Sequence, residues 1–296
     1  MKLNSYSCLR LAALSSLLLF CLAGCAYLPG VSNPDVLSPE QIDKIVSSPD
    51  RTPADRLNDQ RRKPYALLAF LGIRPGMVAL DLSAAGGYTT ELLARAVGPS
   101  GAVYGQSPPG GANRSAPAVL EGNSHPEALS LATGPVAVQA ATRRSSPDAL
   151  AEREQNLQTN GGKAAHIIAL VQRFENPAPQ DKKTGGFDLV TFMFNYHDLG
   201  YQSVDRDMMN HAVFAALKPG GVYVIADHAG RTGTGISDAG TLHRIEEEFL
   251  IREVESAGFK LMARGDFLRN MNDPRDMNTP NPPQPKDELV LKFVRP

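Results

Sequence analysis

The sequence contains only three cysteines, and all of them lie near its start, at Cys8, Cys21 and Cys25. The rest of the 296-residue chain has none, which excludes a disulfide, a cysteine-based metal site and a thiol nucleophile there. An excess of basic residues is also missing, since 30 Lys and Arg stand against 31 Asp and Glu for a net charge of −1. Without a basic surface, nucleic acid is not expected as a substrate or partner.

A long hydrophobic run is missing as well. The apolar segment at residues 11–22 follows Lys2 and Arg10 and is too short to span a bilayer by itself. A basic start followed by such a segment is typical of an export signal. The segment ends in Leu-Ala-Gly-Cys at residues 22–25, which resembles the lipoprotein box of bacteria. The resemblance implies cleavage before Cys25 and attachment of a lipid to its sulfur.

This start of the chain predicts where the protein resides. We expect a signal peptide at 1–24, a tether rich in Pro, Ser and Asn at 25–39, and one domain at 40–296. About two or three acyl chains anchor a protein stably, and Ala26 favours the outer membrane, facing the periplasm. The membrane is then contacted only through the lipid. An ordinary cleaved signal that happens to end in cysteine is the alternative.

The remaining body has the composition of a globular protein, with 42% hydrophobic and 21% charged residues. Strands that alternate with helices favour a parallel sheet with helices on both faces. Two last strands without a long helix between them predict an edge hairpin, so that the final strand is antiparallel. The predicted strands are 78–82, 102–105, 166–171, 187–194, 222–226, 259–267 and 289–294, and the predicted helices are 38–46, 67–71, 89–97 and 204–217.

Residues 107–163 interrupt this alternation. They are rich in Pro, Gly, Ser, Asn and Ala and contain one predicted helix, at 147–157. We interpret them as an insertion over the ligand-binding edge of the sheet, which is either a lid or a surface loop.

Two motifs carry a resemblance to a known family. Asp-Leu-Ser-Ala-Ala-Gly-Gly at 81–87 lies between a predicted strand and a helix, and Leu-Lys-Pro-Gly-Gly at 217–221 precedes the fifth strand. With the closing hairpin they resemble class I S-adenosylmethionine-dependent methyltransferases, and segments 195–198, 226–228 and 238–245 are similar to predicted methyltransferases of bacteria. The resemblance implies an α/β, Rossmann-like fold with a mostly parallel seven-stranded sheet, and S-adenosylmethionine as cofactor.

The turn after the first strand is the expected place of this cofactor. Glycines let the backbone approach a ligand, and the start of the next helix offers unpaired N–H groups to a carboxylate. The family pattern has glycine where Ser83 and Ala85 stand, and an acid where Gln106 stands; glutamine lacks the charge-assisted bond to a ribose hydroxyl. The predicted cofactor-binding residues are Asp81, Ser83, Ala85, Gly86, Gly87, Tyr88, Thr89, Gln106, Glu175 and Asn195.

Polar residues follow the fourth and fifth strands, at the carboxyl edge where ligands of open α/β sheets bind. Methyl transfer aligns an acceptor with the methyl group, and an oxygen or nitrogen acceptor must also lose a proton. Histidine, with an ordinary pKa of about 6.5, suits this task. We expect His197 to be the base, Tyr196 to contact the acceptor and Asp198 to orient the base. The predicted catalytic residues are His197, Tyr196, Asp198, His228 and His243.

Other interpretations stay open. Two histidines and a carboxylate from among His197, His228, Asp198 and Asp227 would fit a transition metal, and the two carboxylates would suit Mg²⁺. No ligand-spacing motif supports a metal, so none is assigned. The favoured function is a methyltransferase with a small-molecule or envelope acceptor. The alternative is a non-catalytic ligand-binding lipoprotein with a degenerate fold, which export from the cytoplasm supports. The terminal hairpin disfavours a nucleotide-dependent oxidoreductase.

Overall fold

The computed structural model describes residues 35–110, 144–161 and 163–296. The predicted signal peptide, the lipidation site Cys25 and most of the predicted tether lie outside these described residues. Residues 34–296 form one compact unit. Within the described part of the chain, no helix has both the length and the apolar character needed to cross a membrane.

Three short helices come before the sheet. Helix α1 (Pro39–Val46) begins at Ser38, whose side chain accepts a hydrogen bond from the backbone of Gln41, and α3 (Pro64–Leu71) ends at Gly72; both were predicted. Helix α2 (Pro53–Arg62) was not, because it is too polar to show an apolar face. The packed body also begins earlier than residue 40, since Leu37 is buried and its N–H donates to Ile73.

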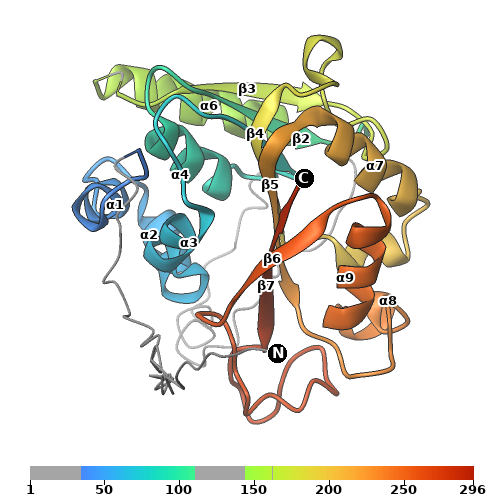
Figure 1. The fold of residues 1–296 in the computed structure, drawn as a ribbon. Helices are drawn as coiled ribbons and strands as arrows, with labels where there is room; N and C mark the ends of the chain where they lie inside the picture. Colours follow the sequence, from blue (N-terminus) through green and yellow to red (C-terminus); the bar gives the residue numbers. More distant parts are fainter. Residues whose placement is uncertain (1–34, 111–143, 162) are drawn as a thin grey trace, which may run out of the picture. The chain divides into compact units, whose positions relative to one another are not determined.

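The sheet has seven strands in the order β3-β2-β1-β4-β5-β7-β6 (Figure 1). The first five strands pair in parallel, and β7 is antiparallel to both β5 and β6. This confirms the predicted fold class. The strands are β1 (Val78–Leu82), β2 (Ala102–Ser107), β3 (His166–Val171), β4 (Phe187–Met193), β5 (Leu217–His228), β6 (Lys260–Gly265) and β7 (Glu288–Val294).

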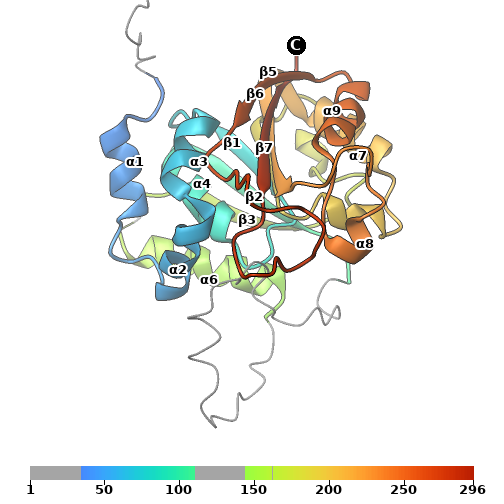
Figure 2. The same cartoon turned by 90° about the horizontal axis from the view of Figure 1, so that it is seen from below.

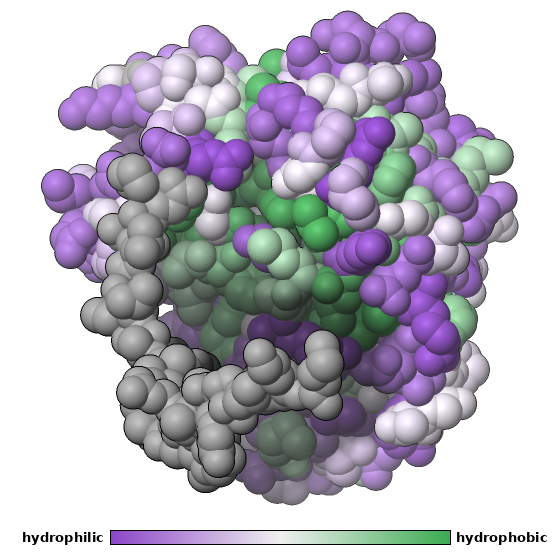
Figure 3. Space-filling model, in the orientation of Figure 1, coloured by the Kyte–Doolittle hydropathy of each residue, from purple (hydrophilic) through white to green (hydrophobic). Residues whose placement is uncertain are grey.

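Helices cover both faces of the sheet, as Figure 2 shows from below. On one face, α1, α3, α4 (Tyr88–Val97) and α6 (Ser146–Thr159) enclose one apolar core, to which Leu68 and Leu93 contribute. On the other, α7 (Arg206–Ala216) and α9 (Glu247–Ser256) enclose a second core with Met209 and Leu250. Alternate residues of the strands point into each core, as the period of a buried strand requires. In Figure 3 apolar side chains gather in the middle of one face, with polar side chains around them.

Helix α9, like α2, was not predicted, and two further elements differ from the predicted ones. Helix α6 is not an insertion, because it packs on β2 and β3 as the crossover helix that connects these parallel strands; residues 111–143 of the predicted lid lie outside the described part of the chain. Strand β5 begins at Leu217, five residues before the predicted start at Val222, because Leu217 pairs with Phe187 before the register shifts at the Pro-Gly-Gly segment.

Candidate functional site

The polar residues after β1, β4 and β5 meet at the carboxyl edge of the sheet. Ser83 Oγ lies 2.9 Å from Asn195 Oδ1, and Asn195 Nδ2 donates to Asp198 Oδ2 over 2.9 Å. Asp198 Oδ1 lies 3.0 Å from Nε2 of His197, and His197 Nδ1 lies 2.6 Å from Oδ1 of Asp227. One chain of contacts therefore connects the turn after β1 with His197, which follows β4.

The turn after β1 has a left-handed backbone at three positions, and two of these residues are not glycine. Ser83 has φ 54°, Ala85 has φ 48° and Gly87 has φ 77°. The left-handed region costs a residue other than glycine about 1–2 kcal/mol, so Ser83 and Ala85 both hold a disfavoured conformation. Such conformations gather at ligand-binding sites. The turn therefore holds three left-handed residues in a row of five.

One side of this turn is packed and the other is open. A Cβ added to Gly87 would lie 2.7 Å from a methyl group of Leu150 on α6, so that side has no room for a ligand. Ala85 and Gly86 are exposed, and a Cβ added to Gly86 would meet nothing within 4 Å. Within the described residues the N–H groups of Ala85 and Gly86 have no hydrogen-bond partner. The open side can therefore accept an anionic group.

Gln106, at the end of β2, is fully buried and its side-chain amide is already used. Its Oε1 accepts from the N–H of Ser83 over 3.0 Å, and its Nε2 donates to the carbonyl of Gln172 over 2.6 Å. The amide thus fastens the turn to β2 and to the segment after β3. It is not free to bind a ribose hydroxyl, the role that the sequence suggested for it.

Asp81 is a buried carboxylate beneath the turn. It accepts hydrogen bonds from the hydroxyl groups of Thr90, over 2.6 Å, and Thr191, over 2.7 Å. Burial raises the pKa of Asp81 to about 6, because it disfavours the charged form more than these two hydroxyl groups stabilise it. Asp81 therefore ties the first turn of α4 and strand β4 to β1, and its oxygens do not reach the open side.

The raised pKa gives a testable pH dependence. The carboxyl group binds its proton more tightly in the folded protein than at its ordinary value of 3.8, so its stabilising contribution is complete below pH 3.8 and is lost as pH rises through 6. Relative to Asp81→Asn, the wild-type free energy of unfolding should fall by roughly 3 kcal/mol between about pH 4 and pH 7. Urea denaturation of both proteins across this range measures the difference, and a pH-independent difference would contradict the raised pKa.

His197 begins a short 3-10 helix, η3 (His197–Gly200), after β4 and is 1% exposed. Its backbone N–H and its Nδ1 both contact Asp227, at 2.7 and 2.6 Å. Burial disfavours a charged imidazole, but the carboxylates of Asp227 and Asp198 outweigh burial and raise the pKa of His197 to about 10. The ring therefore already holds a proton at neutral pH, which does not suit the free base that the sequence suggested.

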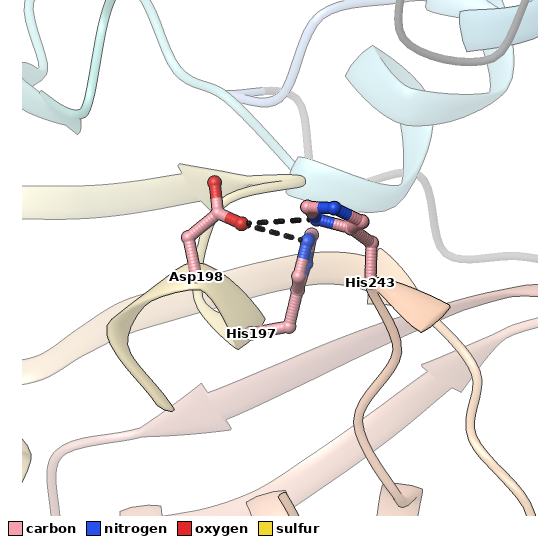
Figure 4. A group of neighbouring side chains, drawn as sticks. All are labelled: His197, Asp198 and His243. Carbon is pink, nitrogen blue, oxygen red and sulfur yellow. Dashed lines mark ion pairs between the residues drawn. The ribbon is translucent and has the colours of Figure 1, made fainter. Parts of the chain in front are cut away.

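Asp198 joins two of the histidines (Figure 4). Its Oδ1 lies 3.0 Å from Nε2 of His197 and 3.4 Å from Nδ1 of His243, and the Tyr201 hydroxyl donates to the same oxygen over 2.7 Å. Burial works against the charge, but His197 and the hydrogen bonds of Tyr201 and Asn195 hold the pKa of Asp198 far below its ordinary value. One nitrogen of each histidine and this oxygen lie within 4.8 Å of one another, an arrangement that could hold a metal ion.

His228 lies beside His197, but its carboxylate neighbour is Glu288 rather than Asp198. Its ring centre is 5.5 Å from that of His197, and its Nδ1 is 3.3 Å from Oε1 of Glu288, which also accepts from Arg61. Burial, together with the charge of Lys286, lowers the pKa of His228 well below its ordinary value. His228 is therefore neutral and is 2% exposed.

Several other residues that the sequence predicted for the site have side chains that lie outside it. Tyr196 is fully buried and points toward α7 and α9, where its hydroxyl contacts Glu253 and Asn210. The Tyr88 hydroxyl donates to Asp59 on α2, and Thr89 is buried in the first turn of α4. Glu175 accepts the N–H of Asp205 and pairs with Arg173.

The sequence did not indicate the roles that two residues have in the site. Tyr201 comes four residues after His197 and contacts Asp198, but an exposed tyrosine gives no signal in the sequence. Asp227 was noted only as a possible metal ligand, whereas it anchors His197. Its position directly after a buried strand was the available signal.

Comparisons with known proteins agree with the topology. No protein-family model and no curated protein matches this sequence. The structure is similar to geranyl diphosphate C-methyltransferase from Streptomyces coelicolor A3(2), at TM-score 0.50 and 11% identity, over 85% of this chain and 84% of that one. It is also similar to a SAM dependent methyltransferase from Aquifex aeolicus, at TM-score 0.49 and 15% identity, over 88% and 100%. The first likeness and the strand order show the fold of class I methyltransferases, and the fold alone.

Proposed function

We propose that this protein transfers a methyl group from S-adenosylmethionine to a small-molecule or cell-envelope acceptor. The observation that carries the proposal is the chain of contacts from Ser83 through Asn195 and Asp198 to His197. It places a ligand-accepting turn and a cluster of titratable side chains at adjacent strand ends. An in-line transfer needs donor and acceptor sites side by side in this way.

The turn after β1 fits one end of the donor. The unpaired N–H groups of Ala85 and Gly86, close to the start of α4, suit the carboxylate of a methionine-derived tail. Asp81 holds the turn in place from below. The ribose end differs from the usual arrangement, because the Gln106 amide is committed to Ser83 and Gln172. We therefore expect donor binding to be weaker than the fold usually provides.

The cluster after β4 fits the acceptor. Methyl transfer forms a bond from an acceptor oxygen or nitrogen to the methyl carbon, while the carbon–sulfur bond breaks and leaves its electrons on sulfur. The acceptor proton must also leave, and we propose that it passes to solvent beside the partly exposed His243 rather than to His197, whose ring already holds its proton. His197, Asp198 and His243 are the titratable groups at this edge, and His243 is 32% exposed, which opens the cluster to an incoming molecule. We propose these three as the catalytic residues, with His228 supporting the ring of His197.

A non-catalytic ligand-binding protein is the second candidate, favoured by the committed Gln106 amide. In either case we propose export and a lipid anchor at Cys25 in the outer membrane, facing the periplasm. The motif at residues 22–25 supports this location. We expect a small-molecule ligand and no nucleic acid, because the chain has no basic excess.

Calorimetric titration of the purified protein with S-adenosylmethionine and with S-adenosylhomocysteine tests the proposal. Saturable micromolar binding of both is expected. Gly86→Glu should weaken binding by about tenfold or more, because it puts a carboxylate into the open side of the turn. The fold should not change, since a Cβ there meets nothing within 4 Å. Gly86→Ala is the matched control and should bind nearly as the wild type does. Absence of heat for both ligands would favour the non-catalytic candidate.

A further inference from the structure

We propose that His197, Asp198 and His243 bind one divalent transition-metal ion of the zinc class. The ligand atoms are Nε2 of His197, Oδ1 of Asp198 and Nδ1 of His243, which all lie within 4.8 Å of one another. The inference goes beyond the proposed function and does not depend on it, because metal binding can be measured without any methyl donor.

The spacing of these atoms agrees with a small coordination sphere. Asp198 Oδ1 lies 3.0 Å from the nitrogen of His197 and 3.4 Å from that of His243. A tetrahedral zinc ion with bonds of about 2.0–2.1 Å separates its ligand atoms by roughly 3.3 Å. The two measured separations bracket this value. The third separation, between the two histidine nitrogens, is at most 4.8 Å, so small movements of the side chains would complete the sphere.

Both histidine nitrogens lack a hydrogen-bond partner although they are buried. Nε2 of His197 and Nδ1 of His243 have almost no solvent contact, and neither makes a hydrogen bond within the described structure. Nε2 of His197 lies 3.0 Å from the carboxylate of Asp198, another of the proposed ligands, with which it forms an ion pair. Buried polar atoms without partners are rare in native proteins, and an ion is one of the few explanations. Each nitrogen can offer a lone pair to a metal ion, which at His197 would replace the proton that the ring holds without a metal.

Surrounding residues already hold the ligands as a metal site requires. Asp227 contacts the opposite ring nitrogen of His197, at 2.6 Å, which is the carboxylate–histidine pairing that orients imidazole ligands. Asn195 and Tyr201 each donate a hydrogen bond to the carboxylate of Asp198. Asn195 donates to Oδ2 and leaves Oδ1 to the metal, whereas Tyr201 donates to Oδ1 itself, which has a second lone pair for the ion.

His243 is held there by strained but anchored backbone. It has φ 51°, in the left-handed region, at the end of α8 (Ala239–Leu242). The next residue, Arg244, is fully buried, pairs with Asp273 at 2.8 Å and donates to the carbonyl of Ala229 at the end of β5. Strain that neighbouring contacts maintain is typical of functional positions.

The ligand types select the kind of metal. Two imidazoles and one carboxylate favour Zn²⁺ and similar ions over Mg²⁺, which prefers oxygen ligands. Three protein ligands leave a further position for water or for an oxygen of the acceptor. His243 is 32% exposed, so this position is reachable from solvent. A metal here would lower the pKa of a bound hydroxyl group.

Titration of chelator-treated protein with Zn²⁺, followed by calorimetry, tests the proposal. One ion per chain is expected, with micromolar or tighter affinity, and Co²⁺ should give the visible absorption of a low-symmetry site. Asp198→Asn and His243→Asn should each weaken Zn²⁺ binding by about 100-fold or more, and Asp227→Asn by about 10–100-fold. His243→Asn preserves the fold, because asparagine tolerates the left-handed backbone.

His211→Ala is the matched control, since His211 is an exposed histidine on α7 outside the cluster. It should bind Zn²⁺ as the wild type does. Failure of the wild type to bind Zn²⁺, or equal affinity in the wild type and both ligand variants, would overturn the proposal. S-adenosylmethionine binding is measured separately, so failure of this site and failure of the proposed function can be told apart.

Discussion

Replacing Asp227 with alanine is expected to lower the free energy of unfolding by about 3–5 kcal/mol. Asp227 is fully buried at the end of β5, and its carboxylate accepts the backbone N–H groups of His197 and His228 as well as contacting the His197 ring. Removing it leaves a buried imidazolium without its main counter-ion and two buried N–H groups without acceptors. Each such loss is among the more destabilising changes that a single substitution can make.

Urea denaturation of the wild type and the variant at neutral pH, in the presence of a chelator, measures this effect. Asp181→Ala is the control, because Asp181 is exposed and its nearest cation, Lys182, is 3.6 Å away. It should change the free energy of unfolding by no more than about 0.5 kcal/mol. A loss of similar size in both variants would show that Asp227 does not anchor His197 as described.

The fold was predictable because its signals are local. Apolar runs such as residues 78–82 and 166–171 are bounded by turn residues and became strands β1 and β3 with the same limits. The closing hairpin followed from the absence of a helix between its strands. Helix α2 was not predicted, because only one of its ten residues, Asp55, is buried. Its cap residue Thr52 and Pro53 were the only signals.

The site was less predictable because it depends on contacts between distant segments. Sequence placed Asn195, His197 and Asp227 at the same edge, since parallel strands end together. It did not show which way each side chain turns: Tyr196 and His197 are neighbours, yet Tyr196 points into the core with Asn210 and His197 points to Asp227.

Ser83 and Gln106 illustrate a second limit. Their departures from the glycine and acid of the family pattern suggest a narrowed, weakened donor site. In the structure the Gln106 side chain instead accepts the backbone N–H of Ser83 and fixes the turn, a contact that a glycine at position 83 would also allow. A substitution that seems to remove a ligand contact thus supplies a structural one. The hydroxyl group of Ser83 makes a separate contact, with Asn195.

Replacing His197 with asparagine is expected to lower methyl transfer by about 10²-fold while leaving donor affinity within about twofold, because it removes the ring that positions Asp198 at the acceptor side. The amide nitrogen of asparagine can take the place of Nδ1 beside Asp227, so the buried contact is kept. The substitution removes Nε2, the atom that faces Asp198 and the acceptor side. The turn at Ala85 and Gly86, where the donor tail is proposed to bind, is untouched. Transfer of radiolabelled methyl groups into an extract of bacterial envelopes measures the rate, and calorimetry measures the affinity.

His211→Asn is the control for this experiment, because it makes the same exchange on the exposed face of α7, and it should transfer methyl groups at the wild-type rate. If the His197 variant lost both donor affinity and transfer rate, His197 would have a structural role. If the variant kept both, His197 would not be a catalytic residue. Only a loss of rate without a loss of donor affinity separates the acceptor side of the site from the donor side. The contacts through Asn195 connect the two sides in the folded protein, and the substitution changes only the acceptor side.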